Sequence, residues 1–148
     1  MHSASIGKIS EPLDFCLWLV KASAALSRRF DGRLGAFHGV SFSDFLVLLH
    51  MSRAPGGRLR RVDLADRLGL TPSAVTRTLI PLEKIGLVTR QTDPHDARAG
   101  YAVLTKSGQR VLREALETAE AISQDAVPRD AAGHLASLSG VLARLVGG

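Results

Sequence analysis

The chain has 148 residues, 45% of them hydrophobic and 5% aromatic, which fits one domain with an aliphatic core and argues against disorder. Its formal net charge of +5 favours an anionic partner, and its single cysteine excludes an intramolecular disulfide framework. The N-terminus lacks the basic start and apolar core of a signal peptide, and the most apolar run, residues 13–26, is too short to cross a bilayer. We therefore expect a cytoplasmic protein with no membrane partner.

Two helices are predicted in the first third of the chain. The first begins after Ser10, with a proline tolerated in its first turn, and its apolar residues recur at helical spacing over 11–34, ahead of a break at 35–39. The second follows a capping box made by Ser41 and Asp44. Because this second helix is apolar nearly all round, we expect it to be buried at the centre of the molecule.

A short helix over 62–68 and a longer helix after Thr71 are predicted next, each followed by a glycine stop. Thr71 is the expected N-cap of the longer helix and Pro72 its first residue. Pro81 lies inside this helix, where it removes one backbone hydrogen bond and predicts either a kink or a looser last turn. A short helix, a tight turn and a capped helix are typical of a helix-turn-helix.

The longer helix has two distinct faces. Its apolar face should pack against the preceding helices and consists of Val75, Thr78, Leu79, Leu82 and Ile85. On the opposite face Ser73, Thr76 and Arg77 lie near the helix start, where hydroxyls can bind bases or phosphates and an arginine can pair with guanine O6 and N7. The helix N-terminus, capped by Thr71, also favours a phosphate oxygen. An ordinary solvent-exposed face is the alternative interpretation.

Strand-like residues 87–92 and 101–105 flank a polar loop over 93–100, which predicts a β-hairpin with a charged tip. Arg98 at this tip suits the negative potential of a narrow minor groove. Asp96, two residues earlier, would orient the Arg98 guanidinium or hold the shape of the hairpin. The hairpin follows the helix-turn-helix directly, as the wing of a winged helix does.

Positive charge is concentrated in the same part of the chain. Residues 53–110 carry eleven Lys/Arg against five Asp/Glu, whereas the remaining residues carry eight against nine. A surface that binds phosphates needs such a concentration, although a basic solvated face would also produce it. Arg61 and Arg90 are candidate phosphate contacts, as are Arg58 and Arg60.

Two further helices are predicted after the hairpin. The fifth starts near Thr105 and runs to about residue 126, Pro128 breaks the chain, and the last helix carries leucines at 3-4-3 spacing. The first and the last two helices carry apolar stripes that little else in the chain can cover. The predicted fold class is therefore mainly α with a small β-hairpin wing, that is, a winged helix-turn-helix with additional terminal helices.

The chain resembles the MarR family of bacterial transcriptional regulators. The residues that carry the resemblance are the D-x-R wing with its downstream L-T, namely Asp96, Arg98, Leu104 and Thr105, together with the segments LADRLGLTPSAVTR and LEKIGLV. The order of six helices with a hairpin between the fourth and the fifth extends the resemblance over almost the whole chain. Pro81 departs from the family pattern, and so does a final helix weakened by Gly133 and Gly140.

The resemblance implies one MarR-like unit over 1–148, with a winged-helix DNA-binding lobe at 41–105 and dimerisation helices at 11–34 and 106–146. It implies a homodimer that binds a pseudo-palindromic operator in double-stranded DNA, acts as a repressor and is released by a small ligand, aromatic in many relatives. No enzyme activity, cofactor or metal is expected, because the five histidines are scattered and no nucleophile motif occurs. A winged helix that binds protein instead of DNA is the alternative.

Two kinds of signal could release such a repressor from DNA. A ligand cleft could be lined by Trp18, Phe30, Phe42 and Phe45, although such aromatic residues are more often simply core. Cys16 lies in a segment similar to the hydroperoxide-sensing branch of the family, where tyrosines favour the reactive thiolate. The corresponding positions here hold Phe30 and Phe42, which donate no hydrogen bond, so a buried and inert thiol is favoured over redox sensing.

Overall fold

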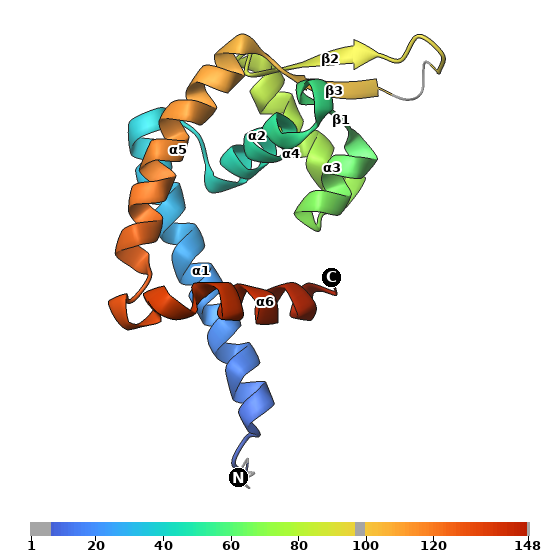
Figure 1. The fold of residues 1–148 in the computed structure, drawn as a ribbon. Helices are drawn as coiled ribbons and strands as arrows, with labels where there is room; N and C mark the ends of the chain where they lie inside the picture. The colour runs from blue at the N-terminus through green and yellow to red at the C-terminus, as the bar shows by residue number, and fades with distance from the viewer. Residues whose placement is uncertain (1–6, 97–99, 148) are drawn as a thin grey trace, which may run out of the picture.

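The computed structural model describes residues 7–96 and 100–147, which form six α-helices and a three-stranded sheet (Figure 1). The helices are α1 (Glu11–His38), α2 (Phe42–Arg53), α3 (Arg61–Leu68), α4 (Pro72–Lys84), α5 (Lys106–Ala126) and α6 (Leu135–Val146). The strands are β1 (Arg58–Arg60), β2 (Val88–Thr92) and β3 (Gly100–Leu104), and 3-10 turns occur at η1 (Pro55–Gly57) and η2 (Arg129–His134). Helices α2 to α4 and the sheet make one lobe, which packs against α5 and the end of α1.

Side-chain caps set the starts of α1, α2, α4 and α5, and the sequence predicts the caps of α2 and α4. Ser10, Thr71 and Thr105 each accept a hydrogen bond from the backbone N–H three residues further on, at 3.0–3.3 Å. Ser41 and Asp44 form the complete capping box, with both reciprocal bonds at 3.0 Å. Each cap satisfies an N–H that the helix leaves without a partner, and its loss typically costs about 1 kcal/mol.

The core of the lobe is aliphatic and centres on α2, as expected for a helix that is apolar nearly all round. Its largest fully buried side chains include Leu48, Met51, Leu64, Val75, Leu82 and Val88. Burying one such side chain contributes about 1.5–3 kcal/mol relative to leaving it in water. The lobe is therefore a rigid support for whatever its surface carries.

The wing is a three-stranded sheet and not only a hairpin. Strands β2 and β3 pair antiparallel, as predicted, and their register places Thr92 opposite Gly100. Strand β1 pairs with the other side of β3, with Arg60 opposite Tyr101. The strand order is β1-β3-β2, so β3 is central. Strand β1 has three residues, which is too short for a period-two pattern to be recognised in the sequence.

Helix α1 is longer than predicted. It continues through Gly35 to His38 and ends at Gly39, whose left-handed backbone (φ 67°) favours glycine. The expected break at 35–39 is wrong because a helix interior tolerates Gly35, while tertiary contacts hold the last turn. His38 makes one of these contacts, with its Nε2 2.6 Å from Oγ1 of Thr118 in α5.

Gly108 joins α5 closely to the lobe. A Cβ at this position would collide with the carbonyl oxygen of Leu87 and lie 2.7 Å from Cδ1 of Leu104. The same carbonyl accepts hydrogen bonds from the backbone N–H and the hydroxyl of Thr105, at 3.1 and 3.0 Å. These contacts hold the first turn of α5 directly against Leu87, the residue before β2.

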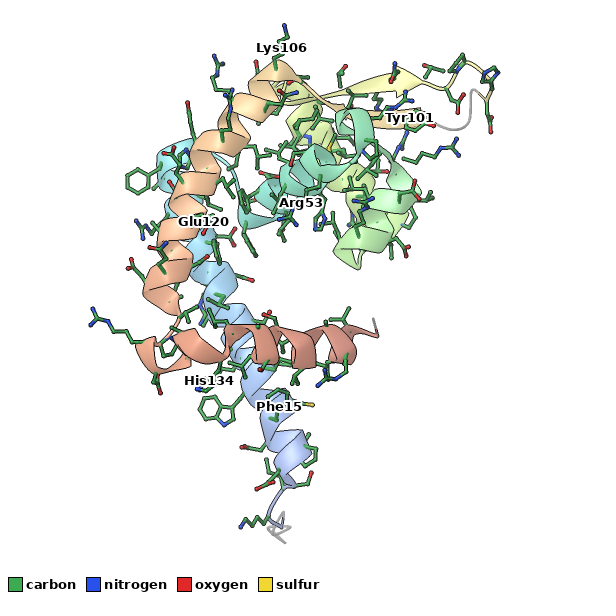
Figure 2. All side chains as sticks on the ribbon, viewed as in Figure 1. Phe15, Arg53, Tyr101, Lys106, Glu120 and His134 are labelled. Atoms are coloured by element: carbon green, nitrogen blue, oxygen red, sulfur yellow. The ribbon has the colours of Figure 1, made fainter. Side chains whose placement is uncertain are left out.

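The N-terminal half of α1 and all of α6 leave apolar side chains in solvent. Every residue of α6 is exposed or half-buried, and Phe15 projects from α1 (Figure 2). The exposed apolar side chains on these helices include Leu13, Phe15, Leu17, Trp18, Val20, Leu138, Leu142 and Leu145. Within the described ranges, no single helix is long and apolar enough to cross a membrane. Only α1 and α2 taken together meet this requirement, and the chain bends by 81° between them.

Candidate nucleic-acid interface

Helix α4 holds an exposed first turn on a buried support. Val75, Leu79 and Leu82 are at most 2% exposed and fix the helix against the rest of the lobe. Thr71 caps the helix and Pro72 is its first residue, as predicted. The helix continues through Pro81 to Lys84, so the proline lies well after the exposed turn.

Two members of the predicted apolar face of α4, Thr78 and Ile85, are less buried than the other three. Thr78 is half-buried, with its hydroxyl donating to the carbonyl of Ala74 at 3.1 Å. Ile85 is 62% exposed, and its assignment to the buried face is wrong. The reason is that α4 ends at Lys84, so helical spacing no longer applies to the next residue.

The outward face of α4 divides into exposed and engaged residues. Ser73 and Arg77 are exposed. Thr76 is half-buried, with its hydroxyl donating to the carbonyl of Pro72 at 3.1 Å and accepting from Nη1 of Arg61 at 3.3 Å. Arg61, at the start of α3, is therefore held against α4.

Arg90 ties the wing to α4. Its Nε lies 2.9 and 3.0 Å from the two carboxylate oxygens of Glu83, which is at the end of α4. The Arg90 charge is thereby offset within the protein. The structure thus gives Arg90 a different environment from the free phosphate contact that we expect from the sequence.

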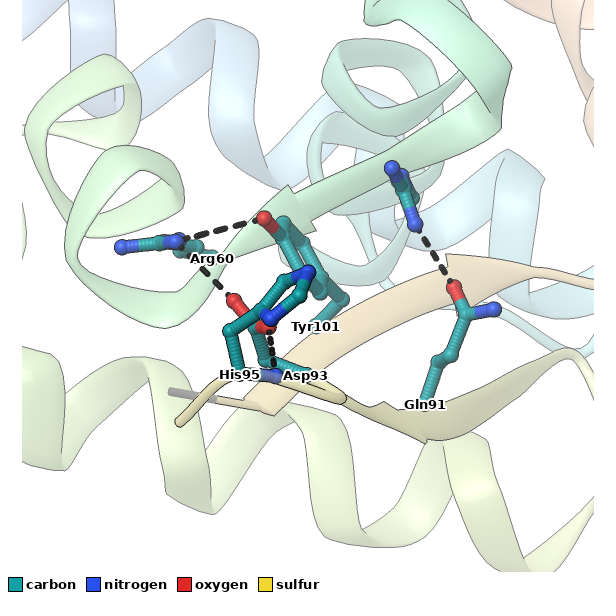
Figure 3. Close-up of polar contacts among 6 residues, drawn as sticks. Arg60, Gln91, Asp93, His95 and Tyr101 are labelled. Atoms are coloured by element: carbon teal, nitrogen blue, oxygen red, sulfur yellow. Dashed lines mark hydrogen bonds and ion pairs between the residues drawn. The ribbon is translucent and has the colours of Figure 1, made fainter. Parts of the chain in front are cut away.

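The outer face of the wing sheet carries a cluster of arginine and tyrosine (Figure 3). The guanidinium carbons of Arg58 and Arg60 lie 4.6 and 5.3 Å from the ring centroid of Tyr101, within the range of a cation–π contact. Arg60 donates to the Tyr101 hydroxyl from Nε and Nη2, at 3.4 and 3.3 Å. This hydrogen bond is the largest cause of a raised pKa at Arg60, and Asp93 adds to it.

The turn after β2 is built on Asp93. One carboxylate oxygen accepts from Nη2 of Arg60 at 3.2 Å, and the other accepts from the backbone N–H of His95 at 2.8 Å (Figure 3). Asp96, the next predicted wing residue, is exposed. Arg98 lies outside the described residues.

Sequence reasoning missed Glu83, Asp93 and Tyr101. Each acts through a partner at least seven residues away, and the identity of that partner depends on strand register for Asp93 and Tyr101 and on how the sheet packs on α4 for Glu83. The one signal in the sequence is the alternation of charged and apolar residues at Arg58, Leu59 and Arg60, of which only the leucine is buried.

The predicted ligand-binding aromatic residues do not share one site. Phe30 stacks on Phe42 at 4.5 Å between ring centroids, and Phe42 lies 6.3 Å from Phe45, at the junction of α1 and α2. Trp18 is 62% exposed and lies about 18 Å along α1 from Phe30, at 1.5 Å per residue. A cavity of about 550 Å³ instead opens between α5 and the lobe; its lining includes Leu49, Ser52, Leu104, Gln109, Leu112 and Arg113.

Cys16 is exposed in this chain, so the expectation of a buried thiol is wrong for the isolated protomer. Cys16 lies in the N-terminal half of α1, which is mostly exposed in the part of the chain that the structure describes, and a helical pattern alone cannot reveal this. Within the described residues, His, Cys, Asp and Glu side chains form no group of three that could hold a metal ion.

Comparison with known proteins places this fold in a family. The family model described as MarR family matches residues 38–99. The regulator BldR from Sulfolobus solfataricus is 30% identical, with 94% of this chain and 99% of that one covered and a TM-score of 0.79. The MarR family regulator Sco3205 from Streptomyces coelicolor, solved in complex with DNA, is 26% identical, with 96% and 90% covered and a TM-score of 0.85.

A third structure shows the fold alone. BpsR from Bordetella bronchiseptica, whose DNA binding is regulated by 6-hydroxynicotinic acid, is 19% identical, with 90% of this chain and 98% of that one covered and a TM-score of 0.79. The helix order, the three-stranded wing and the contact between the N-terminal and C-terminal helical parts agree with the matched family. The chain belongs to the MarR family of winged helix-turn-helix transcriptional regulators, which are not enzymes.

Proposed function

We propose that the chain is a sequence-specific repressor that binds double-stranded DNA as a homodimer in the cytoplasm and is released by a small ligand. The observation that carries the proposal is the first turn of α4, where Ser73 and Arg77 are exposed on a buried apolar support, in a lobe whose wing strands also carry exposed arginines. A helix of this kind fits the major groove, where arginine pairs with guanine. Sco3205, which has this fold, was solved with DNA bound.

Residues around this turn take different parts in the proposal. Arg77 and Ser73 contact bases, while the α4 N-terminus at Thr71 receives a phosphate oxygen. Thr76 and Arg61 hold α3 against α4 through their 3.3 Å hydrogen bond. Arg98 enters the minor groove from the wing, with Asp96 beside it, and Arg90 supports the wing through Glu83.

The homodimer is supported by the apolar side chains that α1 and α6 leave in water. Leu138, Leu142 and Leu145 on α6 are 39–55% exposed, and Leu13 and Leu17 on α1 are 47% and 52% exposed. Covering apolar area contributes on the order of 25 cal/mol per Å². A second copy that contributes the same helices would cover this surface and place two α4 helices on a pseudo-palindromic operator.

Release by a small ligand is supported by the cavity between α5 and the lobe. Its walls combine leucines with Ser52, Gln109 and Arg113, a mainly apolar lining with a few polar groups that is typical of small-molecule sites. An aromatic ligand with an acidic group matches this lining. Because α5 belongs to the dimerisation region and the other walls to the lobe, a bound ligand would alter the spacing of the two α4 helices.

Redox sensing through Cys16 is the alternative signal, and the exposure of this thiol in the protomer favours a test. Cumene hydroperoxide is added while DNA binding is followed, with a Cys16→Ser variant as the control. A loss of affinity that the serine variant does not share would support redox sensing. Unchanged affinity in the wild type would exclude it.

DNA binding itself is tested by fluorescence anisotropy with labelled genomic fragments over a range of salt concentrations. The affinity should fall steeply with salt, because phosphate contacts release counterions. Arg77→Ala should lose about 1–3 kcal/mol and relax sequence preference, whereas Arg129→Ala, with the same charge change outside the lobe, should not. A flat salt dependence and an inert Arg77→Ala variant would support the alternative function, a protein-interaction module.

A further inference from the structure

The contact between Arg60 and Asp93 spans the whole width of the wing sheet. Arg60 ends β1, one edge strand, and Asp93 directly follows β2, the other edge strand, with β3 between them. The guanidinium reaches over Tyr101 of the central strand to place Nη2 3.2 Å from Oδ2 of Asp93 (Figure 3). One side chain therefore joins all three strands on the outer face of the sheet.

Tyr101 holds Arg60 in the geometry that this contact needs. Its ring lies against the guanidinium, and its hydroxyl accepts from both Nε and Nη2 of Arg60. Surface ion pairs are usually weak because ordering two long side chains costs entropy. Here the arginine is already ordered by the tyrosine, and the Asp93 side chain is only 12% exposed, so much of that cost is removed.

Asp93 also holds the backbone of the turn in place. The oxygen that does not face Arg60 accepts from the N–H of His95 at 2.8 Å, which is the bond of an Asx turn. Arg60 fixes the carboxylate, and the carboxylate fixes the turn that leaves β2. A segment ordered before binding loses less entropy when it binds.

We propose that Arg60, Tyr101 and Asp93, the wing bracket, set the wing turn in its DNA-binding shape, so that Arg60 and Asp93 are positioning residues for DNA. This inference rests on the proposed function. It differs from the simple electrostatic view, in which Arg60 contacts a phosphate and Asp93 only repels the duplex. The two views predict opposite signs for the removal of Asp93.

The test compares Arg60→Ala, Asp93→Ala and the double variant with Arg58→Ala. Arg58 is the matched control for the ordering of the turn, because it lies on the same strand and against the same tyrosine but bonds Gln91 and not Asp93. Fluorescence anisotropy on a selected DNA duplex gives affinity and its salt dependence. Thermal unfolding of each variant checks that the fold is intact, which we expect because Arg60 is exposed and Asp93 lies after a strand end.

The wing bracket predicts that Asp93→Ala weakens DNA binding although it raises the net charge by one. The affinity for DNA should fall about fivefold for each wing, which corresponds to the upper end of the energies of surface ion pairs. For a dimer with two independent wings the affinity should fall roughly 25-fold. Arg60→Ala should lose a similar factor with an unchanged salt slope, and the double variant should be no weaker than either single one. Hydroxyl-radical footprints should lose protection at the wing positions and keep it where α4 binds.

Simple electrostatics predicts instead that Asp93→Ala binds more tightly and that the double variant, with its charge restored, regains wild-type affinity. Either result would overturn the wing bracket. Amide exchange of His95 in the free protein tests the contact without DNA: Arg60→Ala should accelerate it several-fold and Arg58→Ala should not. If the wild type binds no DNA, the proposed function fails whatever the exchange rates are; if it binds and Asp93→Ala is neutral, the inference alone fails.

Discussion

Replacing Gly108 with alanine should destabilise the protein by about 2–3 kcal/mol. The new methyl group would collide with the Leu87 carbonyl oxygen, a backbone atom that cannot move aside without disturbing the start of β2. Overpacking of this kind typically costs about 1–3 kcal/mol. Displacing the carbonyl also weakens its two hydrogen bonds from Thr105, each worth about 1 kcal/mol, while alanine regains about 1 kcal/mol of helix propensity.

The control for this substitution is Gly32→Ala in α1. A Cβ at Gly32 meets no atom within 4 Å, so the same change should stabilise the protein by about 0.5–1 kcal/mol. Urea unfolding at one fixed protein concentration measures both variants, because the stability of a dimer depends on concentration. A Gly108→Ala variant as stable as the wild type would show that α5 does not pack against Leu87 as described.

Three other substitutions test separate parts of the structure. Glu83→Gln frees Arg90 from its ion pair and should weaken DNA binding by about 2–5-fold if Arg90 supports the wing; tighter binding would mean that Arg90 contacts phosphate once it is released. The pKa of His50 lies below its usual 6.5, first because of burial and then because of the positive charges of Arg53 and Arg67. The contribution of neutral His50 to the free energy of unfolding should therefore be complete above pH 6.5 and decrease below it. A His50→Gln variant should lose this pH dependence in urea titrations between about pH 7.5 and 5.5. Leu138→Asp should abolish the dimer and DNA binding together in sedimentation and anisotropy measurements, and a folded monomer with wild-type affinity would refute the assigned interface.

Features that depend on neighbours in the sequence could be predicted from the sequence. The caps at Ser41, Thr71 and Thr105 need only a hydroxyl three residues before an N–H, and the β2–β3 pairing needs two strand-like runs around a polar loop. The same applies to the buried stripe of α4 up to Leu82. Each of these features depends only on residues that are close in the sequence, and the structure confirms them.

Features that depend on distant partners could not be predicted. Whether Arg60 faces Tyr101 and Asp93 is decided by the pairing of β1 with β3, and β1 is too short to be recognised. Arg90 could be identified as basic, but its engagement by Glu83 follows from how the sheet packs on α4. The exposure of Cys16 and Trp18 likewise depends on what covers α1, which one chain's sequence pattern does not specify.

The most direct measurement of the central claim is the selection of bound duplexes from a random DNA pool by the wild-type protein. We expect an enriched inverted repeat whose half-sites are about 10–10.5 base pairs apart, one for each α4, with relaxed selection at one position of each half-site by the Arg77→Ala variant. A pool that shows no enrichment at low ionic strength, or an enriched site without two-fold symmetry, would contradict a dimer that reads DNA through α4.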